Sequence, residues 1–404
     1  MEELMMVLNM ILVVLLSISL QAFSQERYSD LRIDCGASNQ TPTRNPDGPI
    51  SWLTDEKFVY TGENQLLRYS QNFSTMNSLR YFPDGQKNCY FLPLYLPQSP
   101  SPLDTKFLFR AGFYYGNYDG LSKPPSFNLE IDGNFWATVT ANSTSNNEPV
   151  YHEMIYMIKR DSAQVCLDNI GDGIPFISSL EATAIDMRNT YRLMENKTAL
   201  LLHSRTNYGA NNTIEQLSHN LDRFNRIWKS KEMTEYLNIA SDRIVDDTMI
   251  GENYPPWPVM ETAIQAKNVS DSIYLSVNFS TQTTAVAYFV LYFSDPINRS
   301  PENSIAQVEI FIDSKKLVAT DVPPYYTSDR FHVVSLYPVQ VNGSANVTIS
   351  PAENSTLPPL LNAMEVFSVV NMPHASKASY LPNLSHVVSF FIFLHLLVII
   401  VFYY

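Results

Sequence analysis

A long internal repeat is the feature that most constrains how this chain can fold. Shifted by 181 positions (288 − 107 = 181), the apolar run at 107–109 falls on a second apolar run at 288–290. With the same shift, the alternating segment at 127–132 falls on the one at 308–313. The positions of the apolar residues are kept although most of the residues differ. This pattern predicts two copies of one domain.

Each copy has the pattern of an all-β domain. Phe127, Leu129 and Ile131 alternate with polar residues, which places one face of a strand on a core and the other in water. Asp-Gly pairs such as the one at Asp132 mark tight turns between short strands, because glycine accepts the positive φ that such turns need. We expect two tandem β-sandwiches of a jelly-roll-like type that pack together.

The expected boundaries follow from this repeat. The first sandwich should cover residues 25–183 and the second residues 257–370. Between them, residues 184–256 should form a structured connector, because the segment 222–228 carries large apolar side chains that need burial and no Gly/Ser-rich linker composition is present.

The N-terminus has the features of a secretory signal peptide over residues 1–24. An apolar run ends at Leu20, and the small residues Ala22 and Ser24 suit cleavage before Gln25. Glu2 and Glu3 depart from the usual pattern, because this region normally carries positive charge. A signal anchor that stays attached is the alternative.

The C-terminus predicts attachment to a membrane. Residues 387–404 are almost wholly apolar, and residues 371–386 form a polar stalk in which Ser376 is a candidate site for a lipid anchor. The alternative is a transmembrane helix in the tail, although such a span normally has a basic flank. Either would hold the sandwiches at the extracellular face of the plasma membrane.

Sequons for N-glycosylation support passage through the secretory pathway. Each Asn-x-Ser/Thr tripeptide is weak alone, but twelve over both halves suit a glycan-covered surface. We expect Asn278 to stay unmodified if it lies inside a strand. The candidate asparagines are Asn39, Asn72, Asn142, Asn196, Asn211, Asn268, Asn278, Asn298, Asn342, Asn346, Asn354 and Asn383.

The charge balance argues against a nucleic acid partner. The chain has 27 Lys and Arg against 40 Asp and Glu, a formal net charge of −13, and no clustered basic segment. Phosphate binding needs such a cluster. Metal-ligand spacing is also absent, so neither a metal site nor a cofactor is expected.

Three cysteines leave the disulfide pairing open among three combinations. We expect Cys35 to pair with Cys89, because both lie where a turn meets a strand. Cys166 is expected to be a small buried apolar residue.

No motif in the sequence indicates an enzyme. It contains no Gly-x-Ser-x-Gly elbow, no His-Glu-x-x-His pair, and none of the Gly-rich, His-Arg-Asp or Asp-Phe-Gly motifs of a kinase. His152-Glu153 is expected to be part of a strand rather than an acid/base pair. Two opposed carboxylates, as glycoside hydrolysis uses, stay conceivable among 40 acidic residues.

A set of motifs, in order along the chain, resembles the malectin-like ectodomain of plant leucine-rich-repeat receptor-like kinases. The motifs are Arg32-Ile-Asp-Cys-Gly36, Arg80-Tyr-Phe-Pro-Asp-Gly85, Asn88-Cys-Tyr90, Phe109-Arg-Ala-Gly-Phe-Tyr-Tyr-Gly-Asn-Tyr-Asp-Gly120, Ile174-Pro-Phe-Ile-Ser-Ser-Leu-Glu181, Arg226-Ile-Trp228 and Tyr254-Pro-Pro256. The resemblance implies two malectin-type sandwiches at the cell surface that sense cell-wall carbohydrate or secreted peptides. The family's Leu-Glu-Leu-Arg-Pro-Leu run is altered here to Leu180-Glu-Ala-Thr-Ala-Ile185.

The best candidate for a ligand site is the loop after the first apolar run. Its members are Tyr114, Tyr115, Asn117, Tyr118 and Asp119. Tyrosine rings offer apolar faces and hydroxyls, and the amide and carboxylate offer fixed hydrogen-bond partners, a combination that suits a sugar ring. Alternatively, these aromatics plug the end of the sandwich.

Two functions follow. The first is a membrane-anchored binding module for carbohydrate or peptide that acts as a co-receptor without kinase activity. The second is a structural or decoy ectodomain that makes only protein-protein contacts with a receptor kinase ectodomain.

Overall fold

The structure, a computed structural model, describes residues 27–373 with gaps at 40, 46–47, 68–73, 96–104, 141–148, 186–188, 212–221, 243–249, 280–283, 298, 300–303 and 325–329. The expected signal peptide, Ser376 and the C-terminal tail lie outside the described residues. Among the helices that fall within these ranges, none has the length and apolar character needed to cross a membrane.

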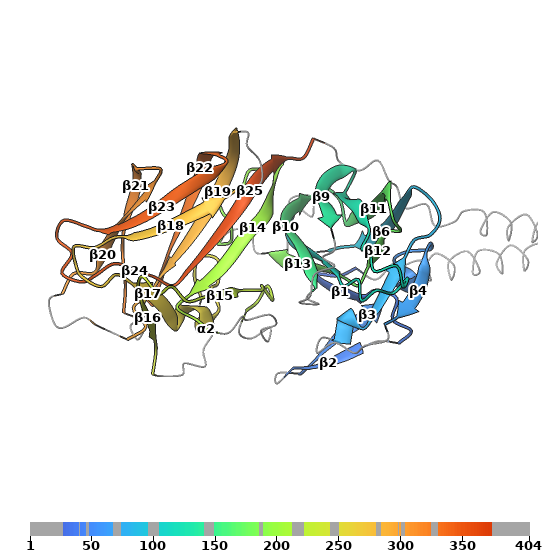
Figure 1. Cartoon of the computed structure of the whole chain (residues 1–404), viewed down its shortest axis with the longest axis horizontal. Helices are drawn as coiled ribbons and strands as arrows, with labels where there is room; N and C mark the ends of the chain where they lie inside the picture. The colour runs from blue at the N-terminus through green and yellow to red at the C-terminus, as the bar shows by residue number, and fades with distance from the viewer. Residues whose placement is uncertain are drawn as a thin grey trace, which may run out of the picture.

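Strands make up nearly the whole fold (Figure 1). In the first half these are β1 (Asp30–Asp34), β2 (Thr41–Asn45), β3 (Gly48–Thr54), β4 (Glu63–Leu66), β5 (Ser78–Tyr81), β6 (Lys87–Pro93), β7 (Thr105–Phe113), β8 (Ser126–Ile131), β9 (Asn134–Thr140), β10 (Val150–Ile158), β11 (Ser162–Asp172), β12 (Phe176–Ile177) and β13 (Ser179–Ile185), with the 3-10 turns η1 (Asp55–Lys57) and η2 (Ser74–Met76).

The second half follows with strands of similar length. They are β14 (Thr198–Tyr208), β15 (Lys229–Lys231), β16 (Leu237–Ala240), β17 (Thr262–Gln265), β18 (Ile273–Asn278), β19 (Thr284–Phe293), β20 (Gln307–Ile312), β21 (Lys315–Asp321), β22 (His332–Asn342), β23 (Ser344–Pro351), β24 (Leu360–Leu361) and β25 (Ala363–Asn371), with the short helix α2 (Trp257–Met260).

The strand order repeats between the halves, which confirms the duplication. The first half has one layer ordered β3-β1-β13-β7-β10 and another ordered β6-β11-β8-β9, and the second has β15-β14-β25-β19-β22 and β18-β23-β20-β21. A small sheet accompanies each, β12-β5-β4 and β24-β17-β16. The segment 184–256 thus contributes β14, β15 and β16 to the second sheet system.

Two glycines show why β14 corresponds to β1. Gly36 and Gly209 follow these strands with φ of +74° and +76°. A Cβ on Gly36 would lie 2.0 Å from the carbonyl oxygen of Leu79, and one on Gly209 would lie 2.3 Å from that of Ala263. Only glycine tolerates both the positive φ and the close approach of the backbone. The sequences Arg32-Ile-Asp-Cys-Gly36 and Arg205-Thr-Asn-Tyr-Gly209 are therefore one motif in two copies.

Burial patterns follow from the layers. β8 and β20 alternate between half-buried and buried positions, as expected for strands with one face on a core. Every residue of β7 is buried, because Phe107 and Phe109 face the core of the first sandwich while Leu108 faces a third cluster on the other side of the sheet. A strand covered on both faces carries a continuous apolar run.

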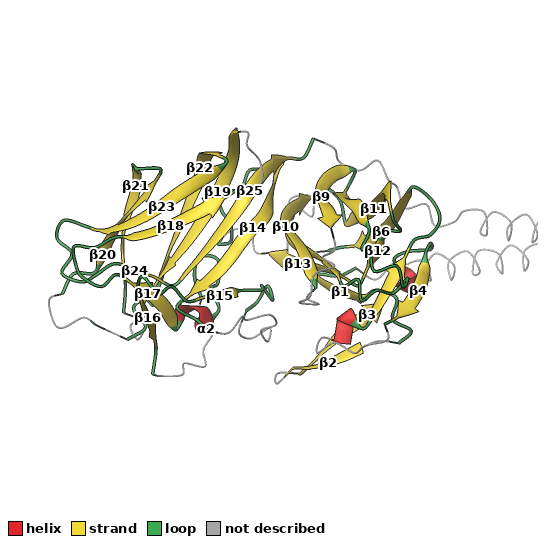
Figure 2. Cartoon of the chain, viewed as in Figure 1, coloured by secondary structure: helices red, strands yellow, loops and turns green. Residues whose placement is uncertain are grey.

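The two sandwiches are joined into one sheet by β10 and β14 (Figure 2). These strands pair antiparallel, with Met154 opposite Leu201 and Tyr156 opposite Ala199. The third apolar cluster extends across this junction, from β7 and β10 to β19 and β25, and includes Trp228 of the segment 222–228. The halves thus pack as one body, as the apolar side chains of that segment predict.

Buried charges cross the same junction. Arg205 of β14 bonds Glu153 of β10 at 2.5 Å and Glu365 of β25 at 2.6 Å, and all three side chains are at most 3% exposed. Arg110 of β7 bonds Glu153 at 3.0 Å and Glu181 at 3.2 Å. We call Arg110, Glu153, Glu181, Arg205 and Glu365 the junction network. Each charge has a partner, which buried charges require.

The predicted disulfide is wrong. Cys89 pairs with Cys166, not with Cys35, and the Cα atoms of the bonded pair are 4.0 Å apart. Cys89 and Cys166 lie directly opposite each other in the antiparallel pair β6–β11, whereas Cys35 follows β1 in another sheet and is a buried free thiol. Burial raises the pKa of the Cys35 thiol well above its ordinary value, with the carboxylate of Asp55 adding to the shift.

Candidate functional site

The tyrosine loop leaves β7 at the end of the first sandwich. Tyr114 and Tyr115 are 3% and 8% exposed and belong to the core of that sandwich. The ring of Tyr115 lies 6.1 Å from that of Phe176 in β12, within the distance at which aromatic rings pack. Both rings therefore belong to the core of the first sandwich.

Asn117 and Asp119 bond to the loop itself. The Asn117 Oδ1 accepts hydrogen bonds from the Ser122 amide at 2.8 Å and the Tyr115 hydroxyl at 3.3 Å. The Asp119 Oδ1 accepts from the Leu121 amide at 3.0 Å and also from the Tyr115 hydroxyl. Burial and the bond to Asp119 raise the pKa of Tyr115 to about 12. These side chains therefore fix the loop's conformation.

Tyr118 connects this loop to the neighbouring sheet. Its half-buried ring lies 5.5 Å from the ring of Tyr81 in β5, and its hydroxyl donates to the Ile174 carbonyl at 3.3 Å. Burial raises the pKa of Tyr118, and the nearby Asp119 carboxylate adds to the shift. Tyr81 donates its hydroxyl to Glu63 Oε2 at 2.5 Å, and this bond raises the pKa of Tyr81. Tyr118 thus contacts Tyr81, which in turn bonds Glu63 of β4.

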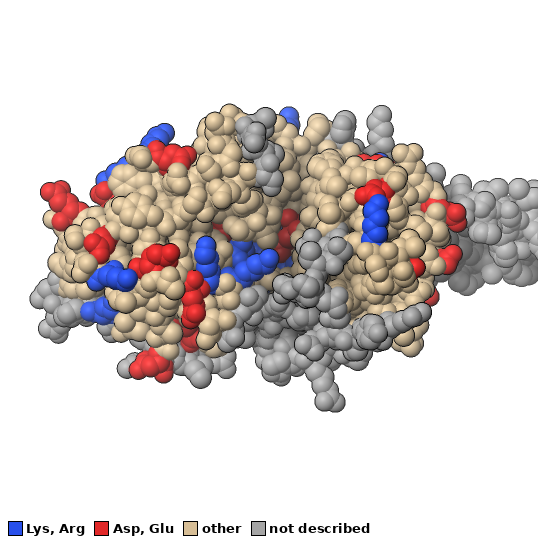
Figure 3. All heavy atoms as spheres, in the orientation of Figure 1, with Lys and Arg blue, Asp and Glu red and all other residues tan. Residues whose placement is uncertain are grey.

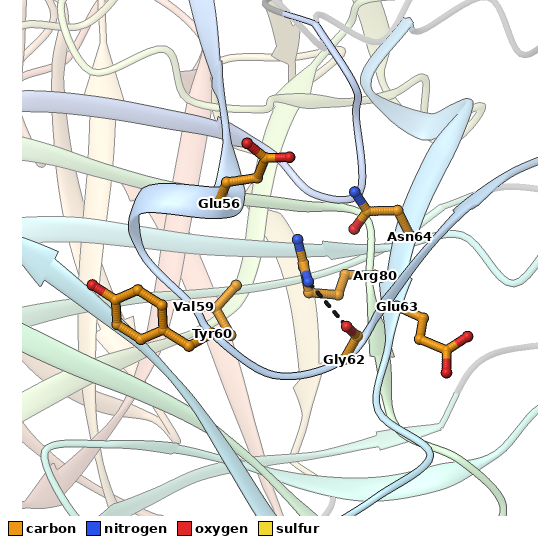
Figure 4. Close-up of a pocket in the computed structure, with 7 residues that line it drawn as sticks. All are labelled: Glu56, Val59, Tyr60, Gly62, Glu63, Asn64 and Arg80. Atoms are coloured by element: carbon orange, nitrogen blue, oxygen red, sulfur yellow. Dashed lines mark hydrogen bonds between the residues drawn. The ribbon is translucent and has the colours of Figure 1, made fainter. Parts of the chain in front are cut away.

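An open pocket of about 450 Å³ lies beside β4 (Figure 4). It is bounded by the turn after β3, by β4 and by β5. Its lining residues are Glu56, Val59, Tyr60, Gly62, Glu63, Asn64 and Arg80. No pattern in the sequence marks this pocket, because its residues are spread over 25 positions (80 − 56 + 1 = 25) and carry no chemical motif.

Arg80 forms the base of the pocket and is held by neighbouring groups. Its Nε and Nη2 atoms donate to the two oxygens of the buried Asp55 carboxylate at 2.7 and 2.9 Å, and Nη1 donates to the carbonyls of Thr61 and Gly62. Asp55 also accepts from Tyr90 at 2.9 Å. The planar, bidentate pairing fixes the guanidinium. Arg80 therefore positions the pocket wall.

The mouth of the pocket is acidic and aromatic. Tyr60 is 76% exposed, and the side chains of Glu56, Glu63 and Asn64, which line other parts of the pocket, are exposed as well. Because Arg80 already pairs with Asp55, the two carboxylates dominate the pocket's charge. Such a surface can accept hydrogen bonds from hydroxyl or ammonium groups and stack a flat apolar face on Tyr60.

Charge over the rest of the molecule is mixed. Figure 3 shows acidic and basic side chains interspersed on the visible face, without one continuous basic stripe. Within the described ranges, no group of three or more His, Cys, Asp or Glu could hold a metal ion. His152 and Glu153 lie in β10, and Glu153 is engaged by Arg110 and Arg205.

Eight of the sequon asparagines lie in the described residues, and all eight are exposed. They are Asn39, Asn196, Asn211, Asn268, Asn278, Asn342, Asn346 and Asn354. Asn278 is the last residue of β18, on its outward face. Asn72, Asn142, Asn298 and Asn383 fall outside the described residues.

The sequence matches the malectin-like domain family over residues 33–369. It is 28% identical over 360 residues to a leucine-rich-repeat receptor-like serine/threonine-protein kinase of Arabidopsis thaliana, covering 87% of this chain and 39% of that relative. It is 29% identical over 370 residues to the receptor-like kinase IOS1 of the same plant, covering 90% and 39%. The chain thus spans well under half the length of these relatives.

Solved structures share the fold. The ANX2 ectodomain of Arabidopsis thaliana superimposes with a TM-score of 0.66 at 16% identity, covering 85% of this chain and 97% of that one. FER in its complex with the plant peptide RALF23 and LLG2 superimposes with a TM-score of 0.61 at 14% identity, covering 86% and 96%.

Proposed function

Because this chain belongs to the malectin-like domain family, we propose that it is an extracellular, non-catalytic module that binds a carbohydrate or a peptide in the pocket beside β4 of its first sandwich. The pocket beside β4 is the observation that carries the proposal. It combines an exposed aromatic ring, two carboxylates and an amide around Arg80, which Asp55 holds in place. A small number of polar groups of this kind can fix the orientation of a ligand, and the aromatic ring supplies contact area.

We propose that the tyrosine loop forms a second part of the binding surface, next to the pocket beside β4. Tyr118 of the loop contacts Tyr81, which bonds Glu63 of the pocket, so a ligand longer than one sugar ring or one residue could contact both the loop and the pocket. Tyr114, Tyr115, Asn117 and Asp119 would then act by holding Tyr118 in place. The carboxylates of Glu56 and Glu63 favour sugar hydroxyls or the cationic side chains of a peptide.

The setting of the module is also part of the proposal. Receptor-like kinases are among its relatives, and one structural neighbour, FER, is found with the peptide RALF23 and with LLG2. By analogy, this chain would act at the cell surface beside a receptor kinase, as a co-receptor held by its C-terminal tail.

Substitutions at the pocket mouth test this function. Tyr60→Ala and Glu63→Gln should each weaken binding to a glycan or peptide found on an array by about tenfold, equivalent to about 1.4 kcal/mol, with the melting temperature unchanged. Tyr274→Ala, at a tyrosine that is 65% exposed in the second sandwich, is the matched control and should bind normally. Tyr115→Ala is unsuitable because its ring is part of the core.

Exposed apolar side chains favour one alternative function, that of a structural or decoy ectodomain that makes only protein-protein contacts. Leu66 in β4 and Leu121 after the tyrosine loop are 73% and 72% exposed, and such residues suit a protein surface. A structural or decoy ectodomain would show no array ligand and would co-purify with a receptor kinase ectodomain. Leu66→Asp would then break that complex while Tyr60→Ala would not.

A further inference from the structure

Exposed sequon asparagines gather on the outer face of β18 and β23. In this antiparallel pair, Asn346 lies opposite Ser276, and Asn278 lies opposite Ser344. Asn278 and Asn346 are exposed, while Val277, which lies between Ser276 and Asn278 in β18, is buried in the second core. Because side chains alternate across a strand, the two asparagines point to the same side, away from the core.

Tyr274 stands on this face next to Asn346. It is 65% exposed and lies opposite Thr348, so it is the diagonal neighbour of Asn346. Diagonal neighbours on one sheet face are about 7–8 Å apart, within reach of long side chains. The backbone of Tyr274 is fixed by Tyr236, whose hydroxyl accepts from the Tyr274 amide at 2.8 Å and donates to its carbonyl at 3.3 Å.

We propose that Asn346 carries an N-linked glycan whose first N-acetylglucosamine packs on the ring of Tyr274. In the attachment step the Nδ2 of Asn346 forms a bond to the anomeric carbon of a lipid-linked pyrophosphate oligosaccharide. The bond from that carbon to the pyrophosphate breaks, the amide loses a proton, and the lipid pyrophosphate leaves. The sequon Asn346-Val-Thr348 supplies the acceptor.

The position of β18 gives this glycan a physical role. In the described part of the chain, β18 pairs with a strand only on its β23 side. An exposed edge strand invites pairing with another chain, and proteins protect such edges with charged side chains or by covering them. At Tyr274 the Tyr236 hydroxyl already bonds the backbone amide and carbonyl, and the rest of this side of β18 is left for a glycan to cover. A glycan over Tyr274 would cover both the apolar ring and the approach to this edge. Partner proteins would then contact other surfaces.

The test uses the full chain secreted from plant cells. Glycopeptide mass spectrometry should find Asn346 modified. Tyr274→Ala should lower the melting temperature of the glycosylated protein by about 2 °C, with the glycan intact or trimmed to one N-acetylglucosamine, and Tyr274→Phe should restore it. In an Asn346→Gln background, Tyr274→Ala should have no further effect. Asn354→Gln, at an exposed sequon in a loop, is the control background and should leave the effect of Tyr274→Ala in place.

Two results would overturn this inference. One is an unmodified Asn346. The other is an equal loss on Tyr274→Ala in the Asn346→Gln background, since the ring would then contact only protein. The inference shares with the proposed function only passage through the secretory pathway. Loss of array binding by Tyr60→Ala is measured separately, so either can fail while the other holds.

Discussion

Replacing Glu365 with glutamine tests the energetics of the junction network. The Glu365 carboxylate is fully buried, and its Oε1 accepts from the Arg205 Nε at 2.6 Å and the Tyr191 hydroxyl at 2.9 Å. Its Oε2 accepts from the Tyr292 hydroxyl at 2.5 Å. Glu365→Gln keeps the volume but removes the charge. Among the described residues, Arg205, itself 1% exposed, then keeps Glu153 alone as a charged partner.

The expected loss is large because water cannot replace the missing charge. Removing one partner of a buried ion pair costs about 3–5 kcal/mol, and the retained bond to Glu153 places this case near the lower end. The matched change, Glu309→Gln, removes a carboxylate that pairs with Lys316 at the surface, where the two side chains are 24% and 52% exposed. Exposed pairs contribute about 0–1 kcal/mol.

Urea unfolding followed by tryptophan fluorescence measures both variants. Trp228 is buried with the Arg205 guanidinium 5.6 Å from its ring centroid, and it contributes to the emission together with the three other tryptophans of the chain. The free energy of unfolding should fall by about 3 kcal/mol for Glu365→Gln and by less than about 1 kcal/mol for Glu309→Gln. Equal losses in the two variants would refute the reasoning.

Two further predictions concern the backbone and pH. Gly209→Ala should prevent secretion of folded protein, because the new Cβ would lie 2.3 Å from the Ala263 carbonyl oxygen. Gly133 also has a positive φ, +78°, but has open space around it, so Gly133→Ala should lower the free energy of unfolding by only about 1–2 kcal/mol in thermal unfolding. Burial opposes ionisation of Glu153, but Arg205 and Arg110 outweigh it and hold the pKa of Glu153 below its ordinary value. Its contribution to stability is therefore complete above the unfolded pKa of about 4.3 and is lost as pH falls below it. The free energy of unfolding, measured across this pH range, should therefore fall less steeply with decreasing pH in Glu153→Gln than in the unmodified protein. An unchanged slope would contradict the lowered pKa of Glu153.

The tyrosine loop shows where local patterns stop being informative. The sequence places Tyr114, Tyr115 and Tyr118 beside a turn, but the same composition suits a ligand surface and a plug. Phe176, 61 positions after Tyr115 (176 − 115 = 61), packs on the Tyr115 ring and makes its burial part of the core. The pocket beside β4 depends on Asp55, which fixes Arg80 from another turn. Neither contact has a signature in the sequence.

The sequence by itself determined the duplicated all-β architecture, because the alternation in 127–132 and the apolar run at 107–109 are local consequences of strand geometry and recur at a fixed spacing. Only the tertiary structure decided that Cys89 bonds Cys166, that Arg205 joins the two sandwiches, and that an acidic pocket opens beside β4. These features depend on the register between strands far apart in the chain. A one-residue change of register turns a side chain to the other face of its sheet, and the local pattern does not record which partner it will meet.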